Sequence, residues 1–395
     1  MKNKKVNIKI KPRKYTLYGK KKSKGKQVLA GVITVIAAAA LCVVGYGIGR
    51  PVMDYFRNRQ NAPAESSIPW TPTFEETVQS PETEPPTTET AEPTTEAAEE
   101  TKPVGAYFLP DSACLSSESL NGAIAAAKNN GARAVVVTLK DNMGYLLYKT
   151  AVSGVADSDI VTGTLTAKQI CDIITKAGLT PAARISTTKD HVGGAYIGGN
   201  FIISGDGGSW HDAAVANGGK KWLNPFSDNT VSYIRSLTGE IAAAGFKEII
   251  LSNNIFPDFH PSDYTTYLYD EPIGDEAART EALWKIIDAA RTAANANGAE
   301  LLVEMSAEAL YAENKLATNA EAASDAEKLA KVTLLLDYSF ENTSYSETKA
   351  FIGRTNAALK NSSFAVMIIN SSFSAGAGDE VKRAFEEAGV AVYTG

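Results

Sequence analysis

Residues 245–259 read GFKEIILSNNIFPDF and combine a glycine, an apolar run and a polar cluster. The run has the continuous Ile and Leu content of a strand that is covered on both faces. Gly245 precedes it by a few residues, as glycine does where a helix ends. The stretch therefore predicts a buried parallel strand that opens onto a polar cluster formed by Ser252, Asn253 and Asn254.

Similar apolar runs recur between residue 104 and the end of the sequence, with amphipathic helix patterns between them. The predicted strands cover residues 104–109, 133–139, 180–186, 247–253, 299–305, 332–338, 364–370 and 390–394. Strict alternation of strand and helix implies right-handed crossovers and a parallel sheet. Eight strands in about 290 residues match a closed (β/α)8 TIM barrel. An open doubly wound sheet is the alternative, although no glycine-rich phosphate loop follows the first strand.

The N-terminal part of the chain has a different composition. Residues 1–26 contain twelve Lys or Arg and no acidic residue, and residues 28–49 carry no charge. A helix of this length rises roughly 33 Å, enough to cross a bilayer core of about 30 Å. Because Lys and Arg stay on the cytoplasmic side, we expect a single-pass transmembrane helix over residues 27–49 with a cytoplasmic basic tail. A cleaved signal peptide is the alternative, and the long apolar run favours the anchor.

Residues 50–103 are rich in Thr, Pro and Glu, as in PETEPPTTETAEPTTEAAEETKP. Such a segment buries too little apolar surface to offset the entropy of ordering. We therefore expect a disordered extracellular linker between the membrane and a barrel of residues 104–395. An exported chain with only three cysteines is what we expect of a Gram-positive bacterium. Cys114 and Cys171 either form a disulfide or pack as small apolar side chains.

The charge distribution bears on the class of partner. The whole chain has a formal net charge of −6, but residues 51–395 hold 26 Lys or Arg against 45 Asp or Glu, which gives −19. This part of the chain lacks the basic surface that nucleic-acid binding requires. The three histidines do not have the close spacing of a metal site, and the chain has no phosphate loop. We expect no metal and no cofactor.

Four stretches carry a family resemblance. They are VVVTLKDNMG at 135–144, AARISTTKD at 182–190, KWLNPF at 221–226 and GFKEIILSNNIFP at 245–257. In order and spacing they resemble a bacterial glycoside hydrolase domain family with an amylase-like barrel, formerly a domain of unknown function. The resemblance implies a TIM barrel of sugar-active ancestry. Thr138 stands where the family has its first acid, Ser252 where it has the strand-four acid, and Ile255 where it has an arginine.

Active sites of such barrels lie at the C-terminal ends of the strands. Glycoside cleavage needs two carboxyl groups, about 5 Å apart for retention or about 6.5–9.5 Å apart for inversion. Glu304 and Asp337 lie at the ends of adjacent predicted strands. We interpret them as a candidate acid/base couple that replaces the lost one. Alternatively, Glu304 forms an ion pair and Asp337 caps the next turn.

Several other side chains at these strand ends and loops are candidates for substrate binding. They are Lys140, Asp141, Arg184, Asp190, Trp210, Asn253, Asn254 and Asn370. Trp210 lies in a long loop of residues 187–228, where an exposed ring would stack on a sugar; Trp222 of the same loop is expected to pack as structure. The alternatives are structural: a salt bridge of Lys140 with Asp141, neutralisation of Asp141 by Arg184, and asparagines that cap turns.

These features together predict a membrane-anchored extracellular barrel, similar to glycoside hydrolases, that recognises a cell-envelope or environmental polysaccharide. Ser252 and Ile255 replace both the acid and the arginine that the resemblance implies at these positions. The loss of both charged residues favours binding, or weak hydrolysis, over full activity. The alternative function is a non-catalytic envelope scaffold that docks another protein. Such a scaffold predicts an exposed apolar patch on the helical exterior.

Overall fold

The computed structural model describes residues 105–259, 263, 273–310, 326–338, 344–359, 362–368 and 377–395. The predicted basic tail, transmembrane helix and linker (residues 1–26, 27–49 and 50–103) lie outside the described residues. Within those ranges, no helix has both the length and the apolar character to span a bilayer.

Parallel strands close into a barrel with strand order β1 to β8. Their bounds are β1 Tyr107–Phe108, β2 Ala134–Lys140, β3 Thr180–Ser186, β4 Glu248–Ser252, β5 Glu300–Ser306, β6 Thr333–Tyr338, β7 Phe364–Ile368 and β8 Val392–Thr394. Closure is direct, because Tyr107 of β1 is in register with Thr394 of β8. The prediction of a closed (β/α)8 barrel is confirmed, and the open sheet is excluded.

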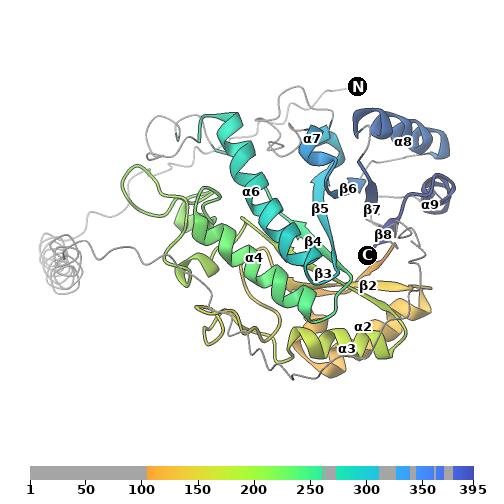
Figure 1. Ribbon diagram of the computed structural model, residues 1–395, viewed down its shortest axis with the longest axis horizontal. Coiled ribbons are helices and arrows are strands. Elements are labelled where there is room, and N and C mark those ends of the chain that lie inside the picture. Colours follow the sequence, from red (N-terminus) through yellow and green to blue (C-terminus); the bar gives the residue numbers. More distant parts are fainter. Residues whose placement is uncertain are drawn as a thin grey trace, which may run out of the picture. The chain divides into compact units, whose positions relative to one another are not determined.

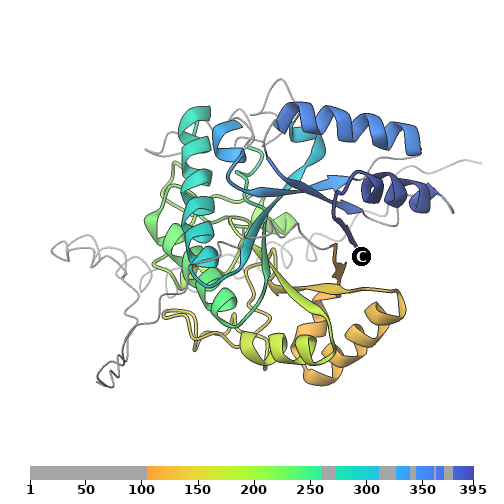
Figure 2. The same cartoon turned by 45° about the vertical axis from the view of Figure 1, so that its right-hand side comes forward.

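Helices surround the barrel (Figure 1). Their bounds are α2 Ser117–Asn129, α3 Ala167–Lys176, α4 Asp228–Ala243, α6 Glu276–Asn295, α7 Ala326–Leu329, α8 Tyr345–Leu359 and α9 Ala377–Glu387. The long helices α4 and α6 lie side by side across the outside of the strands, and the turned view shows α8 beside α9 (Figure 2). Short 3-10 turns occur at Asp111–Leu115, Gly193–Ala195, Val215–Asn217 and Ala307–Leu310.

Local sequence signals set the helix ends. Thr166 and Gln169 form a capping box at the start of α3, in which each side chain accepts a hydrogen bond from the other residue's backbone N–H. After α3 and α4 the chain turns at Gly178 and Gly245, whose φ angles of 78° and 106° favour glycine. Each glycine is followed within three residues by a strand, as the sequence predicts.

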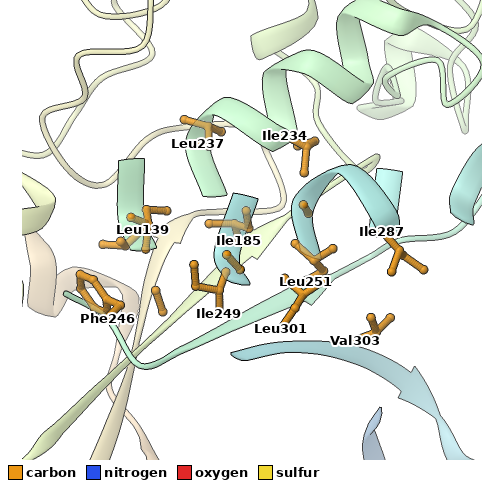
Figure 3. Close-up of a cluster of buried hydrophobic side chains, with 14 of the residues drawn as sticks. Leu139, Ile185, Ile234, Leu237, Phe246, Ile249, Leu251, Ile287, Leu301 and Val303 are labelled. Atoms are coloured by element: carbon orange, nitrogen blue, oxygen red, sulfur yellow. The ribbon is translucent and has the colours of Figure 1, made fainter. Parts of the chain in front are cut away.

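The outer core fills the space between the strands and the helices. Figure 3 shows its side chains from β2 to β5 facing those of α4 and α6, and the labelled residues are Leu139, Ile185, Ile234, Leu237, Phe246, Ile249, Leu251, Ile287, Leu301 and Val303. All of them are buried. Cys114 and Cys171 also belong to this core as free thiols, so of the two alternatives they pack as apolar side chains.

The inside of the barrel is built in layers, because side chains alternate between the two faces of each strand. A buried apolar cluster occupies the middle and comprises Ala106, Ala134, Val136, Ala182, Ile250, Leu302, Leu335, Ala365 and Tyr393. Toward the N-terminal end, the Tyr393 hydroxyl donates to Glu248 at 2.6 Å. Burial, with the charge of Glu248, raises the pKa of Tyr393. The barrel interior is therefore packed, and its C-terminal end is where a site can form.

The thiol of Cys114 provides a test of this core. Burial, with the charge of Asp111, raises the pKa of Cys114 to about 12. Because the thiolate is the reactive form, we expect iodoacetamide at about pH 8 to leave Cys114 unmodified in the native protein and to alkylate it in urea. Peptide mass spectrometry reads out the modification. Rapid alkylation of Cys114 under native conditions would contradict the packing described here.

Candidate functional site

Four side chains, one from each odd-numbered strand, form one layer near the C-terminal mouth of the barrel. Phe108, Arg184, Glu304 and Met367 each stand two residues beyond a member of the buried interior cluster on their strand. They therefore point inward as well. All four are half-buried, whereas the layer below them is fully buried. We call this set of four residues the mouth layer.

Arg184 and Glu304 form a bidentate ion pair across the mouth layer. Arg184 Nε donates to Glu304 Oε2 at 2.7 Å, and Arg184 Nη2 donates to Glu304 Oε1 at 2.9 Å. The two side chains are 28% and 17% exposed. Burial opposes the charge of Arg184, but the hydrogen bonds and charge of Glu304, with the charge of Asp111, outweigh it and raise the pKa of the guanidinium. The alternative in which Arg184 neutralises Asp141 is therefore wrong.

Asp337 lies on the same wall as Glu304. In the register of β5 with β6, Glu304 pairs with Leu335 and Ser306 pairs with Asp337. Asp337 stands two residues beyond Leu335 of the interior cluster, so it also faces inward. The structure thus brings the two predicted carboxylates to diagonal positions on neighbouring strands. Their predicted role as an acid/base couple stays a prediction.

Thr138 and Ser252 occupy the positions where the family resemblance implies acids. Both are buried at the ends of β2 and β4. The Ser252 hydroxyl donates to the carbonyl oxygen of Ile185 at 3.3 Å. Neither residue supplies a carboxylate, so strand four contributes backbone support to the mouth and no acid.

The asparagines after β4 also bond to the protein itself. Asn253 has a φ of 51°, a left-handed conformation that asparagine tolerates better than most residues. Its side-chain amide donates to Ser186 Oγ at 3.1 Å. Its backbone carbonyl oxygen accepts from the hydroxyl groups of Thr187 and Thr188. Asn254 is buried, with its amide 3.5 Å from the Leu283 carbonyl oxygen. Asn370 lies outside the described residues.

Lys140 and Asp190 form an ion pair in which both side chains are fully buried. Lys140 Nζ lies 2.9 Å from Asp190 Oδ2 and donates to the Ser186 carbonyl oxygen at 2.7 Å. Asp190 Oδ1 accepts from the backbone N–H of Val192 and Gly193 at 3.0 and 2.6 Å. The pair therefore fastens the end of β2 to the loop after β3. The salt bridge of Lys140 with Asp141, one of the alternatives, is not formed.

Two glycines leave space for the Asp190 carboxylate. A Cβ atom on Gly144 would lie 2.0 Å from Asp190 Oδ1, and one on Gly193 would lie 2.5 Å from Oδ2. Gly144 comes from the loop after β2, and Gly193 from the loop after β3. Asp141 orders the first of these loops, because its Oδ1 accepts from the backbone N–H of Met143 and Tyr145, both at 2.9 Å.

The long loop of residues 187–228 is packed against the barrel. Trp210 is only 5% exposed, and its ring meets Phe259 edge-on with centroids 5.0 Å apart. The exposure that we predicted for Trp210 is wrong, because the loop folds this ring into the core. Trp222 packs as expected and donates through Nε1 to Asp212 at 3.1 Å. Contact of Trp210 with a sugar would require this packing to open.

We did not predict Phe108 and Met367 as site residues from the sequence. The same is true of Asp111, whose charge helps to raise the pKa of Arg184. Strand alternation was the signal that pointed to the first two. Phe108 follows Ala106 by two residues, and Met367 follows Ala365 by two. Because both runs are continuously apolar, however, the pattern of residues does not distinguish their inward positions from their outward ones. In the described part of the chain, no three His, Cys, Asp or Glu side chains gather as metal ligands would.

His191 makes the long loop sensitive to acid. Its Nδ1 accepts from the backbone N–H of Lys221 at 3.0 Å. Burial, with the charges of Lys221, Lys220 and His211, lowers the pKa of His191 against the opposing charge of Asp190. The neutral form is the one that accepts this hydrogen bond. Its stabilisation is therefore present above the ordinary pKa and is lost as the pH falls through the lowered one.

We expect the melting temperature of the wild type to exceed that of His191→Ala at about pH 7.5, and the difference to shrink toward about pH 5. His191→Asn is the matched control, since its amide oxygen accepts from Lys221 at either pH. Thermal unfolding followed by circular dichroism gives the melting temperatures. A difference that stays constant over this range would contradict the role of the neutral imidazole.

The buried ion pair predicts a large loss of stability. Asp190→Asn leaves the Lys140 charge buried without its counter-charge, so we expect the free energy of unfolding to fall by about 3–5 kcal/mol. Asp172→Asn is the control, because its pair with Lys168 is on the surface with side chains 44% and 64% exposed. Urea denaturation measures both. Equal, small effects of the two substitutions would refute the importance of the buried pair.

A family model described as "Putative glycosyl hydrolase domain" matches residues 106–335. No curated protein matches the chain. A hypothetical protein from Ruminiclostridium thermocellum ATCC 27405 is 22% identical, with a TM-score of 0.42, and the match covers 50% of this chain and 96% of that one.

Two glycoside hydrolases are also similar in structure. The glycoside hydrolase domain of PgaB (BpsB) from Bordetella bronchiseptica is 11% identical with a TM-score of 0.49, covering 74% of this chain and 93% of that one. An exo β-N-acetylglucosaminidase of family GH20 from Vibrio harveyi is 13% identical with a TM-score of 0.44, covering 67% and 41%. The family model spans more than half of the sequence, and the chain therefore belongs to the family of glycosyl hydrolase domains that this model describes.

Proposed function

We propose that this protein is an extracellular, membrane-anchored barrel that binds a cell-envelope or environmental polysaccharide at its C-terminal mouth, with weak hydrolysis at most. Membership of the glycosyl hydrolase domain family supports a sugar as the ligand. The uncharged segment 28–49 after a basic tail supports the anchor, and the segment 50–103 supports a tether. The barrel then works at a distance from the membrane, outside the cell.

The observation that carries the proposal is the bidentate pair of Arg184 with Glu304. Glu304 is the acid that the mouth layer presents, and each of its carboxylate oxygens accepts a hydrogen bond from the guanidinium. A general acid must give a proton to the leaving oxygen, and a nucleophile must approach the anomeric carbon. The first role requires a proton on an oxygen that accepts from Arg184, whereas binding of hydroxyl groups leaves both of these hydrogen bonds in place.

Hydrolysis by Glu304 with Asp337 is the competing form of the same function. Their placement on the neighbouring strands β5 and β6 supports it, since glycoside cleavage uses two carboxyl groups that lie near each other on either side of the scissile bond. Thr138 and Ser252 count against it, because the positions that resemble the family's acids have no carboxylate. We therefore place binding first and slow turnover second.

A docking scaffold is less well supported. That function predicts an apolar patch on the helical exterior. Across the described ranges, the large apolar side chains that are exposed are Leu115, Tyr196 and Val215. They come from three separate turns in loops that follow β1 and β3, and none belongs to a helix of the outer ring.

The test uses the full-length protein in detergent with soluble oligosaccharides and purified cell wall. We expect measurable binding with little release of reducing ends, and about tenfold weaker binding by Glu304→Gln, because hydrogen bonds to a charged group are lost. Glu300→Gln is the control, since Glu300 lies at the opposite end of the same strand and accepts from Thr333. Calorimetry measures binding, and a reducing-sugar assay measures turnover.

The same experiment separates the alternatives. Should reducing ends be released and should Glu304→Gln or Asp337→Asn abolish the release, the protein is a hydrolase that uses this pair. Release that survives both substitutions would exclude the pair as catalytic. Failure of every glycan to bind would remove the sugar-binding proposal itself.

A further inference from the structure

The mouth layer is divided into an apolar half and an ionic half. Phe108 on β1 and Met367 on β7 are close neighbours around the barrel, because β8 alone separates their strands. Arg184 on β3 and Glu304 on β5 stand on the other side, with β4 between them. One side of the floor thus offers carbon surface, and the opposite side offers charged hydrogen-bonding groups.

Phe108 is an aromatic ring inside the barrel that is not fully covered. Its ring packs above Tyr393, with centroids 6.2 Å apart and planes tilted by 49°. The hydroxyl of Tyr393 bonds to Glu248 toward the N-terminal end, so the polar end of that ring is turned away from the mouth. Gly395, the residue after β8, lies beside Phe108, since a Cβ on it would be in van der Waals contact with the Cβ of Phe108 at 3.4 Å.

We propose that Phe108 and Met367 form an apolar platform on which one uncharged pyranose unit of the glycan stacks, while Arg184 and Glu304 bind its hydroxyl groups. This inference rests on the proposed function and specifies the site and the class of sugar. A pyranose has a flat face of C–H groups and a rim of hydroxyls, and aromatic surface matches the first. From the sequence we predicted Trp210, and not Phe108, as the ring that stacks on a sugar.

The ionic half has hydrogen-bonding capacity to spare. A guanidinium has five N–H donors, and a carboxylate has about four lone-pair positions. The two bonds between Arg184 and Glu304 use two on each side. The remaining donors and acceptors suit hydroxyl groups, which both donate and accept. The pair therefore binds a sugar rim without being broken.

Charge at the mouth selects against anionic sugars. Glu304 neutralises Arg184 at 2.7 Å, so the guanidinium offers no free positive charge to a carboxylate or sulfate. Asp111 contributes a further negative charge within reach of Arg184, and Asp337 stands next to Glu304 on the wall. A uronic acid or a sulfated sugar would meet net negative charge. An uncharged unit meets no such penalty.

The test compares Phe108 with the residue beside it. Full-length protein in detergent is titrated calorimetrically with cellohexaose and chitohexaose as uncharged probes and with hexagalacturonate as the anionic probe. Phe108→Leu keeps an apolar side chain of similar size but removes the aromatic face, and Phe108→Trp restores it. Tyr107→Leu is the matched control, because Tyr107 is half-buried on the same strand but packs on the outer core.

We expect at least one uncharged probe to bind, with an association constant about tenfold lower in Phe108→Leu and recovered in Phe108→Trp. Tyr107→Leu should bind like the wild type, and hexagalacturonate should bind more weakly than the uncharged probes. Equal melting temperatures of the Phe108 variants and the wild type would show that the loss is not a folding defect.

Two results would overturn the inference while leaving the proposed function intact. One is unchanged binding of the uncharged probe by Phe108→Leu when Glu304→Gln weakens it, which would place the sugar elsewhere on the mouth. The other is stronger binding of hexagalacturonate than of either uncharged probe. Absence of binding by all three probes and by purified cell wall would instead overturn the proposed function and this inference together.

Discussion

The ion pair of Lys140 with Asp190 is the interaction on which the geometry of the mouth depends. Removing two charges from water is costly, and the pair is tolerated because its atoms have further partners: the Ser186 carbonyl for the ammonium and two backbone N–H groups for the carboxylate. It joins the end of β2 to the loop after β3, the strand that carries Arg184. Tyr233 packs near the ammonium, 5.8 Å from its ring centroid, and burial with the charge of Asp190 raises the pKa of that tyrosine.

This arrangement answers what the polar cluster after the fourth strand does. Ser252 donates to the backbone of β3, and Asn253 adopts a left-handed turn that lets its carbonyl oxygen accept from two threonines. These groups connect β4 to the loop after β3 and carry no proton chemistry of their own. The acid at the mouth is provided by Glu304 on the neighbouring strand β5, where the guanidinium of Arg184 holds it.

The barrel was predictable from the sequence because its signals are local: apolar runs of strand length, glycines that end helices, and helix caps such as Thr166. The positions of Glu304 and Asp337 at the ends of neighbouring strands were predictable from the same apolar runs. The pairing of Arg184 with Glu304 was not predictable, because Glu304 is 120 residues away in the chain and the pair forms only when the barrel closes. The burial of Trp210 was missed for a similar reason, because Phe259, which covers it, belongs to another loop.

The space around the Asp190 carboxylate has a consequence for how this barrel can change. Gly144 and Gly193 come from different loops, yet each leaves too little room for a methyl group beside the same two oxygen atoms. A larger residue at either glycine would therefore displace the Asp190 carboxylate, and with it the other loop that packs against this carboxylate. Grafting a single loop from a relative to alter ligand preference would misplace its neighbour, so the two must be exchanged together, as one inherited unit.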